Sequence, residues 1–425
     1  MADPRAARNR FSHTHPQTRS VSEGFDPALS VGVVRSPIYP VSTYCFESAE
    51  QAAYWFEVAL GKTAAPAGAR PELIYARLNH PNGEMFEDAL RAVEKGARAA
   101  AVFSSGMAAI TTTVLTLVKP GQTLLYQRPV YGGTDHFFRH MLPEWNVKAV
   151  AVPEGGWDDA LSTHAAELAL VYIETPANPT LHMIDLQNVH EKMKRRGAQK
   201  AWLVVDNTFL GPVFQSPLLH GADLSVYSAT KFLGGHSDLV AGAVTAKDVE
   251  LLAKIKATRA FLGAICEPFT AWLLQRSMAT LWLRMIKQSK NAVKLIQVLK
   301  THPAVKKVYH PSLFVGEQAR VAEKQCNAPG SMIAFELEGG QPAAFRFLNA
   351  LTLVKLAVSL GGVESLACHP RTTTASEMSE EDLAAGGVTE GLVRLSVGVE
   401  YWRDIAADLQ RALDAAIAVP TNEGT

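Results

Sequence analysis

The feature that most constrains the fold is a regular alternation in the middle of the chain. Between Pro81 and Leu262, short apolar runs alternate with segments of helical character. This alternation predicts a doubly wound, mostly parallel α/β sheet. The runs are continuously apolar, as expected when helices cover both faces of a sheet. The predicted strands are Ala99–Phe103, Thr123–Tyr126, Val147–Val152, Leu168–Ile173, Trp202–Asp206 and Leu224–Tyr227.

The segments on either side have a different character. Prolines interrupt the first 80 residues and little apolar periodicity survives, so we expect an extended N-terminal arm over residues 1–80 that contacts a neighbouring subunit. One short helix is expected within Ser48–Leu60. A cofactor-binding domain over 81–268 and a smaller α+β substrate domain over 269–425 complete the predicted organisation. The second domain is expected to contain strands Ser331–Leu337, Leu353–Ser359 and Leu392–Ser396 and a closing helix with an apolar stripe at Ile405, Leu409, Leu413 and Ile417.

Composition removes several classes of function. The chain has 41 basic and 41 acidic residues, so it has no excess of positive charge that would attract nucleic acid. A small-molecule substrate is therefore expected. Its 4 cysteines are scattered and too few for a disulfide framework, which indicates a reducing compartment. We find no secretory signal and no run of about 18 apolar residues, so we expect a cytoplasmic protein without membrane contact.

Lys231 is the first candidate for chemistry. It follows the end of a predicted strand and two hydroxyl residues, and it precedes a glycine pair. A solvated loop lysine is the ordinary interpretation. A lysine partly desolvated among apolar neighbours would have a lowered pKa and a free amine able to form an imine with an aldehyde cofactor. Ser228 and Thr230 would then donate hydrogen bonds to a phosphate.

Two further strand ends carry suitable groups. Asp206 ends an apolar strand, and ligands of open α/β sheets bind at the carboxyl ends of strands. A buried carboxylate there could pair with a protonated pyridine nitrogen, although a turn or N-cap role is the alternative. Gly106 follows another strand and opens a helix, where backbone N–H groups bind phosphate. That signal is weak alone, since many α/β proteins have such a connection.

An aromatic ring and a polar turn complete the set. Tyr131 stands beside a glycine pair, so its ring could stack on a planar cofactor and its hydroxyl could act as an acid or base, whereas core packing is the alternative. The stretch Glu174–Pro179 places polar groups after the strand that precedes it. No companion ligands surround the 13 histidines, so no metal site is predicted, and the pair His136 and His140 is expected to serve packing or the surface.

In this order and spacing, the motifs resemble the Cys/Met-metabolism family of pyridoxal-phosphate enzymes, which includes cystathionine γ-synthase and methionine γ-lyase. The similarity runs from about Pro37 to Leu413. It implies pyridoxal-phosphate transferase fold type I and pyridoxal 5′-phosphate as cofactor. The most specific stretches are YARLN at 75–79, SSGM at 104–107, YGGT at 131–134, ETPANP at 174–179, VDNTF at 205–209, YSATKFLGGHSD at 227–238 and SLGGVESLACHP at 359–370.

The resemblance also implies a role for each matching residue. Lys231 would be the Schiff-base lysine and proton shuttle, and Asp206 the partner of the pyridinium nitrogen. Tyr131 would stack on the ring and assist loss of the γ-substituent. Gly106, Met107, Ser228 and Thr230 would bind the phosphate, Tyr75 and Arg77 would reach it from the adjoining subunit, and Arg394 would bind the substrate carboxylate with support from Ser359 and Asn178. The family's usual assembly is a homotetramer made of two dimers with shared active sites.

The implied reaction is γ-elimination or γ-replacement on a γ-substituted L-amino acid, such as an S- or O-substituted homoserine, through a vinylglycine-type intermediate. Alternatives are a cystathionine or cysteine lyase acting by β-elimination and an enzyme using S-adenosylmethionine as aminobutyrate donor. Departures from the family pattern disagree about substrate. Gly133 replaces the cysteine typical of methionine γ-lyases, whereas Ile74 and Val358 replace acidic residues common in cystathionine γ-lyases.

Overall fold

The computed structural model describes residues 13–27, 30–59, 61–66 and 72–417. These residues group into two compact units. The first unit comprises residues up to Thr116 together with Val226–Gly234 and Leu239–Thr280. The second unit comprises Leu117–Ser225, Gly235–Asp238 and the chain from Leu281 onward.

The N-terminal arm lies in the first unit and contains two helices, α1 (Pro16–Ser22) and α2 (Ala49–Ala59). Helix α2 confirms the helix expected within Ser48–Leu60, of which Leu60 itself lies outside the described residues. Helix α1 was not predicted. It begins where the side chain of His15 accepts a hydrogen bond from the backbone N–H of Gln17, and Pro16 occupies its first turn.

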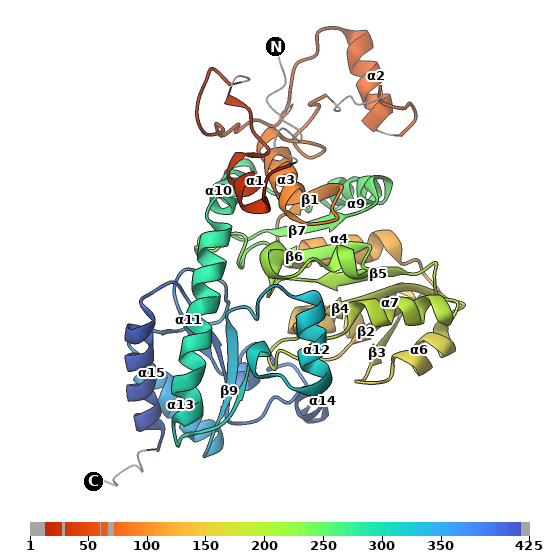
Figure 1. The fold of residues 1–425 in the computed structure, drawn as a ribbon. Helices are drawn as coiled ribbons and strands as arrows, with labels where there is room; N and C mark the ends of the chain where they lie inside the picture. Colours follow the sequence, from red (N-terminus) through yellow and green to blue (C-terminus); the bar gives the residue numbers. More distant parts are fainter. Residues whose placement is uncertain (1–12, 28–29, 60, 67–71, 418–425) are drawn as a thin grey trace, which may run out of the picture. The chain divides into compact units, whose positions relative to one another are not determined.

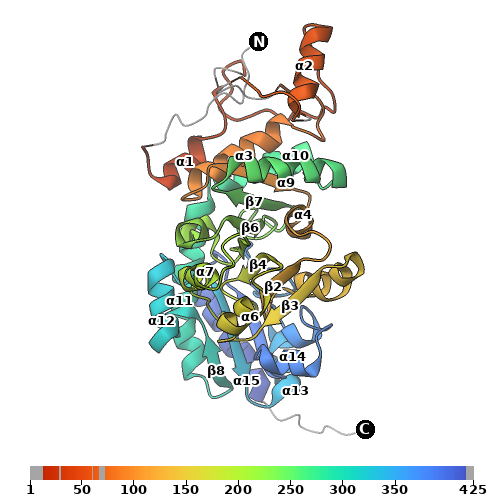
Figure 2. The same cartoon turned by 90° about the vertical axis from the view of Figure 1, so that its right-hand side faces the viewer.

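The rest of the first unit packs helices on a pair of strands. Helix α3 (Pro81–Val93) is buried along most of its length and packs against α1, α10 (Pro268–Met278) and strand β1 (Figure 2). Strand β1 (Ala99–Phe103) pairs antiparallel with β7 (Gly242–Ala246), and helix α9 (Val249–Leu262) contacts both strands. This antiparallel pair agrees with a sheet that is mostly, but not wholly, parallel.

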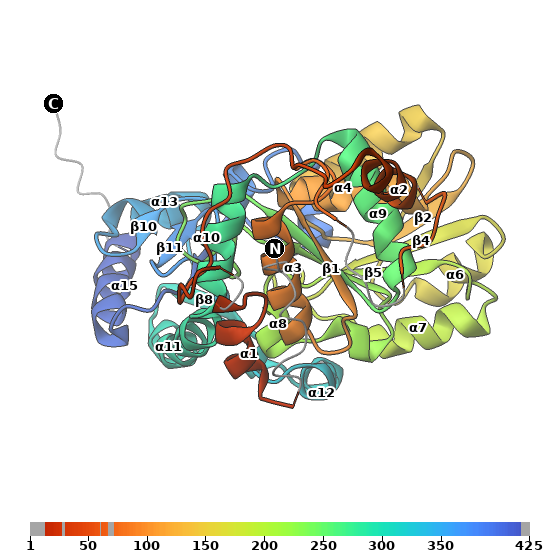
Figure 3. The same ribbon diagram turned by 90° about the horizontal axis from the view of Figure 1, so that it is seen from above.

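Four parallel strands form the sheet of the second unit, in the order β3-β2-β4-β5 (Figure 1). All residues of β4 are buried, which explains why its sequence is apolar up to the terminal Glu174, apart from the hydroxyl of Tyr172. The parallel register places Glu174, at the end of β4, opposite Asp206, at the end of β5. Helices α6 and α7 pack against each other beside this sheet (Figure 3). The bounds are β2 (Thr123–Gln127), β3 (Lys148–Val152), α6 (Trp157–His164), β4 (Leu168–Glu174), α7 (Leu186–Arg195) and β5 (Trp202–Asp206).

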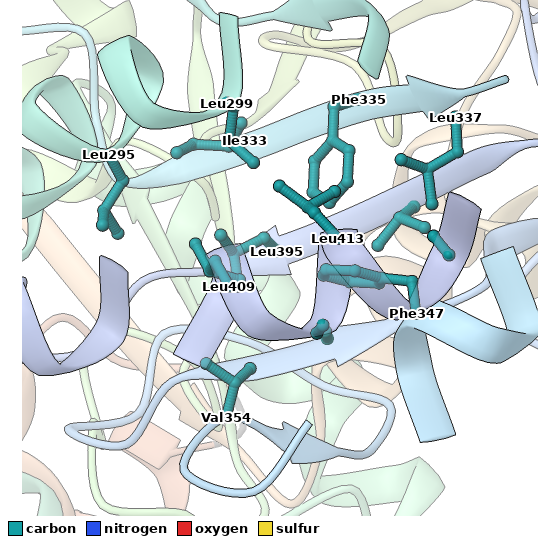
Figure 4. Close-up of a cluster of buried hydrophobic side chains, with 14 of the residues drawn as sticks. Leu295, Leu299, Ile333, Phe335, Leu337, Phe347, Val354, Leu395, Leu409 and Leu413 are labelled. Carbon is teal, nitrogen blue, oxygen red and sulfur yellow. The ribbon is translucent and has the colours of Figure 1, made fainter. Parts of the chain in front are cut away.

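A second sheet, of five strands, lies in the C-terminal part of the second unit. Its order is β10-β11-β12-β9-β8, and helices α11, α13 and α15 pack against it. Their apolar side chains meet those of the sheet in one buried cluster that includes Phe335, Phe347 and Leu413 (Figure 4). The bounds are α11 (Leu281–Thr301), β8 (Val305–Tyr309), β9 (Met332–Leu337), α13 (Gly340–Ala350), β10 (Lys355–Leu356), β11 (Leu366–Cys368), β12 (Leu392–Ser396) and α15 (Trp402–Ile417).

The predictions for this region were right in part. The strands expected at Ser331–Leu337 and Leu392–Ser396 are present, and so is the closing helix. The strand expected at Leu353–Ser359 was wrong in length, because only Lys355–Leu356 is extended and paired. Ser359 has a φ of 88°, which no strand residue adopts.

The remaining elements are short or connect the sheets. They are α4 (Gly106–Leu117), α5 (Gly132–His136), a π-helical turn (Phe137–Met141), α8 (Gly211–Phe214), β6 (Leu224–Ser228), α12 (Gly316–Gln325), α14 (Glu380–Ala385) and 3-10 turns at Leu142–Trp145, Pro217–His220, Pro311–Leu313 and Pro370–Thr372. Within the described ranges, no helix has both the length and the apolar character needed to cross a membrane.

Candidate functional site

Asp206 is the last residue of β5, and its carboxylate is buried and oriented by hydrogen bonds. The backbone N–H and the hydroxyl of Thr208 donate to its Oδ1 at 2.9 and 2.6 Å, and the hydroxyl of Tyr172 donates to its Oδ2 at 3.1 Å. Burial raises the pKa of Asp206, whereas the bonds from Thr208 and Tyr172 favour the charged form. The carboxylate is therefore held in one orientation, and a cation beside it would be strongly favoured.

Glu174 is the corresponding last residue of β4. Its Oε2 accepts a hydrogen bond from the backbone N–H of Tyr131, and its Oε1 accepts one from the backbone N–H of Asn178, both at 2.9 Å. Burial, followed by the nearby charge of Asp206, raises the pKa of Glu174 to about 8. This one carboxyl group thus links two turns that carry predicted site residues.

Arg394 lies in the middle of β12, and its side chain is directed to two other site residues. One terminal nitrogen donates to Oδ1 of Asn178 at 3.2 Å, and the other donates to the backbone carbonyl of Ser359 at 3.1 Å. Arg394 is only 3% exposed, and both of these acceptors are neutral oxygens. A guanidinium held in this way offers a planar fork suited to a carboxylate.

Tyr131 directly precedes α5, and its backbone is held from both sides. Besides the bond to Glu174, its carbonyl accepts hydrogen bonds from the N–H groups of Thr134 and Asp135 at 2.9 and 3.0 Å. The Tyr131 side chain is 45% exposed, in contrast to its well-held backbone. The second unit therefore brings Asp206, Asn178, Ser359, Arg394 and Tyr131 together with Glu174 in one hydrogen-bonded region.

The first unit contains the turn Ser228–Lys231, which follows strand β6. Strand β6 ends at Ser228, and the backbone N–H of Lys231 donates to the Ser228 carbonyl at 3.1 Å. The hydroxyl of Thr230 is fixed on both sides by Ala241, since it donates to the Ala241 carbonyl at 3.1 Å and accepts from its N–H at 2.9 Å. This tight turn displays Ser228, Thr230 and Lys231 along one short stretch of chain.

Gly106 opens helix α4 beside this turn. A Cβ atom at position 106 would stand 2.9 Å from Cβ and 3.0 Å from Oγ of Ser228, so the close approach requires glycine. Ser105 caps the helix, because its Oγ accepts from the N–H of Ala108 at 3.0 Å. Gly106 and Met107 head the first turn of α4, where backbone N–H groups have no intrahelical acceptor and can bind an anion.

Tyr75 and Arg77 form a separate pair in the arm. The guanidinium of Arg77 donates to the carbonyl of Ala260 on α9 at 3.0 Å and lies 5.8 Å from the Tyr75 ring centre. The Tyr75 side chain is 43% exposed. Arg77 thus connects this pair to α9, and the Tyr75 side chain remains partly exposed.

These observations fit pyridoxal phosphate, the cofactor that the resemblance implies. The glycine-lined helix terminus beside Ser228 suits a phosphate, and the buried, oriented carboxylate of Asp206 suits a protonated ring nitrogen. No group of three or more His, Cys, Asp or Glu side chains is placed to hold a metal ion in the described part of the chain.

Three residues of this region were not predicted from the sequence. Glu174 was noted only within a polar turn, although its place at a strand end beside Asp206 was a usable signal. Tyr172 sits within an apolar strand, so nothing in its spacing marked it as the donor to Asp206. Thr208 follows Asp206 by two residues, a common spacing for a hydroxyl that bonds a carboxylate.

Comparison with known proteins gives a consistent identity. The family described as "Cys/Met metabolism PLP-dependent enzyme" matches residues 17–414. L-methionine gamma-lyase from Pseudomonas putida is 38% identical over 400 residues, which cover 94% of this chain and 97% of that protein. Cystathionine gamma-synthase from Escherichia coli (strain K12) is 38% identical over 342 residues, covering 80% of this chain and 88% of that protein.

Solved structures agree and confirm the predicted fold type I. The crystal structure of cystathionine gamma synthase from Xanthomonas oryzae pv. oryzae in complex with cystathionine matches with a TM-score of 0.85 and 35% identity, covering 95% of this chain and 98% of that one. Cystathionine gamma lyase (CalE6) from Micromonospora echinospora matches with a TM-score of 0.83 and 37% identity, covering 94% and 99%. By its sequence and by its fold, this chain belongs to the Cys/Met metabolism family of PLP-dependent enzymes.

Proposed function

We propose that this enzyme catalyses γ-elimination or γ-replacement on a γ-substituted L-amino acid, such as an S- or O-substituted homoserine or a methionine-like compound. One observation carries the proposal: Arg394, Asn178, Glu174 and Tyr131 form a continuous series of hydrogen bonds. The series begins at a guanidinium suited to an α-carboxylate and ends at the backbone N–H of Tyr131, whose phenol is suited to proton transfer. It would hold the two ends of one amino-acid substrate in a fixed relation.

The residues then divide the work as follows. When bound, pyridoxal phosphate supplies an electron sink for the bond electrons released at Cα. Arg394 binds the substrate α-carboxylate, with Asn178 and Ser359 orienting the guanidinium. Lys231 would remove the proton from Cα, pass it on to C4′ of the bound cofactor so that its amine is free again, and then remove a proton from Cβ. The hydroxyl of Tyr131 would protonate the departing γ-group. The oriented carboxylate of Asp206 stabilises positive charge on the ring nitrogen.

The phosphate is assigned to residues of the first unit and of a second copy of the chain. Gly106 and Met107 would donate backbone N–H groups, and Ser228 and Thr230 would donate hydroxyls. Tyr75 and Arg77 would complete this site in a neighbouring subunit, which makes the active site shared. We therefore propose a homotetramer built from two such dimers, working in the cytoplasm.

The side chain beside the carboxylate anchor bears on substrate choice. Val358 directly precedes Ser359, whose carbonyl accepts from Arg394, and is 53% exposed, so it would offer an apolar surface to the substrate. Such a surface suits an uncharged distal group better than a second amino-acid moiety. Ile74 is only 5% exposed in the arm and so contributes less exposed surface than Val358.

The test is a product analysis with the cofactor-loaded protein. L-Methionine, L-cystathionine and O-acetyl-L-homoserine are supplied separately, with and without a thiol, and products are identified by mass spectrometry. Release of 2-oxobutyrate supports γ-elimination, and a new thioether formed from the thiol supports γ-replacement. Pyruvate as the sole 2-oxo acid from L-cystathionine would show β-elimination and contradict the proposal.

A further inference from the structure

A charged side chain on α14 is connected to the helix that follows Tyr131. The Asp382 carboxylate accepts hydrogen bonds from terminal nitrogens of Arg128, on its Oδ1, and of Arg139, on its Oδ2, the latter at 2.8 Å. The Asp382 side chain is 13% exposed. Hydrogen bonds from the two guanidinium groups hold the pKa of Asp382 well below its usual range, so this carboxyl stays charged.

The same two arginines also bind Asp135, which lies within α5. Nε of Arg128 lies 3.2 Å from Oδ1 of Asp135, and a terminal nitrogen of Arg139 lies 3.5 Å from its Oδ2. The hydroxyl of Tyr126 donates to Asp135 as well, at 3.1 Å. Two carboxylates and two guanidinium groups therefore alternate in one network that joins α14 to α5.

This network ends at the backbone of Tyr131. The N–H of Asp135 donates to the Tyr131 carbonyl at 3.0 Å, so the position of Asp135 sets the first turn of α5. The N–H of Thr134 donates to the same carbonyl at 2.9 Å, and the N–H of Tyr131 donates to Oε2 of Glu174 at 2.9 Å. Since the Tyr131 ring is half exposed, the direction of its hydroxyl depends mainly on these backbone anchors.

The segment around α14 also lies close to the residues on either side of Tyr131. A Cβ atom at Gly132 would stand 3.0 Å from the carbonyl oxygen of Thr374, and one at Gly386 would stand 3.4 Å from Cβ of Pro129. Thr374, upstream of α14, thus lies close to Gly132, and Gly386, directly after α14, lies close to Pro129. The Asp382 network lies between these two contacts along the α14 segment.

We infer that Asp382 is a positioning residue for Tyr131. It draws Arg128 and Arg139 into one arrangement, which fixes Asp135 and with it the start of α5, so that the Tyr131 hydroxyl points to the departing γ-group. The inference rests on the proposed function for its effect on turnover. This role differs from general stabilisation of the fold, because the effect of Asp382 on turnover should require the hydroxyl of Tyr131.

A double-mutant cycle tests this connection. Asp382→Asn removes the charge at constant shape, and Glu381→Gln, the exposed neighbour on α14, is the matched control. With whichever of the three γ-substrates above turns over fastest, we expect Asp382→Asn to lower kcat about tenfold, equivalent to about 1.4 kcal/mol of barrier, with little change in KM. In a Tyr131→Phe background the same change should have almost no further effect on kcat. An equal loss in both backgrounds, or an equal loss in Glu381→Gln, would overturn the inference.

Amide hydrogen exchange provides a second measurement that does not depend on turnover. In Asp382→Asn, exchange at the amides of Thr134 and Asp135 should be faster than in the wild type and in Glu381→Gln. Unchanged exchange there would overturn the inference even if activity fell. If no γ-substrate is turned over by the wild type, the proposed function fails while this measurement still decides the structural connection. Should Asp382→Asn not fold, Arg139→Gln, at a more exposed position, should show the same pattern at smaller size.

Discussion

At the scale of single residues, the site works because polar groups on the strands are held by specific partners. Arg394 shows this most clearly, since its two terminal nitrogens are oriented by Asn178 and Ser359. We predict that Arg394→Lys raises KM for the amino-acid substrate about tenfold or more, because an ammonium cannot make the planar, two-point contact. Steady-state kinetics checks this against Arg403→Lys, a change at an exposed position on α15. An unchanged KM in Arg394→Lys would remove Arg394 from the substrate site.

Glu94 gives a prediction about stability and pH. It is fully buried, and the hydroxyl of Tyr227 donates to its Oε2. Burial raises the pKa of Glu94 from 4.5 to about 8. A raised folded-state pKa means that the stability associated with the protonated group is complete below pH 4.5 and is lost as the pH rises towards 8.

Glu94→Gln should therefore be more stable than the wild type by an amount that grows between pH 4.5 and 8 and is constant above. The amide keeps an acceptor for Tyr227 but has no charge to bury, and each pKa unit corresponds to about 1.4 kcal/mol. Denaturant unfolding across this pH range measures the difference, with the exposed Glu144→Gln as control. A difference that is the same at all pH values would show that Glu94 is not buried with a raised pKa.

Which residues could be predicted from sequence depends on how far apart their partners lie. Lys231, Asp206 and Tyr131 each stand in a short motif that can be interpreted locally, and the family resemblance added Arg394. Asp382 could not be predicted, because its partners Arg128 and Arg139 are about 250 residues away and only the fold brings them near. A residue whose role is to orient side chains distant in the sequence has no local motif by which a single sequence could reveal it.

At the scale of elements, the start of α4 is sensitive to the addition of a single methyl group. A Cβ at Gly106 would meet Ser228 at 2.9 Å, closer than real Cβ contacts, so the helix terminus and the β6 turn would have to separate. We predict that Gly106→Ala weakens binding of pyridoxal phosphate about tenfold, since the phosphate site would widen.

The control for this prediction is Gly83→Ala in the first turn of α3. A Cβ there would meet its nearest neighbour, in Val102, at an ordinary 3.6 Å. Cofactor titration followed by visible absorbance compares the two variants. Wild-type affinity in Gly106→Ala, or an equal loss in Gly83→Ala, would exclude the start of α4 as the phosphate site.

The elements missed in the sequence share a physical cause. Strand β7 is five small residues, β8 carries two lysines and is half exposed, and β11 has only three residues. Each pairs in its sheet through backbone hydrogen bonds and neighbours distant in sequence, so apolar periodicity alone did not mark it. The strands predicted correctly, such as β5 and β12, are mostly apolar and are buried over their whole length or nearly so.

At the scale of the whole molecule, the proposed sharing of active sites gives a test by complementation. Tyr75 and Arg77 are assigned to the phosphate of a neighbouring subunit, and Lys231 to its own. Arg77→Ala and Lys231→Ala proteins should each be impaired, and co-assembled chains should regain activity, because some sites then combine an intact Lys231 with an intact Arg77. Assembly in solution is checked by light scattering. Co-assembled chains that gain no activity over the separate variants would show that these residues do not share a site.

The central claim is that Lys231 moves the protons at Cα and Cβ. The most direct measurement is turnover by Lys231→Ala loaded with pyridoxal phosphate, with Lys254→Ala on the exposed side of α9 as control. Loss of a positioned proton-transfer group typically lowers rates by about 10² to 10⁴. We predict a fall of at least that size in release of 2-oxobutyrate or formation of thioether for Lys231→Ala, and wild-type rates for Lys254→Ala. Turnover by Lys231→Ala at the wild-type rate would contradict the account.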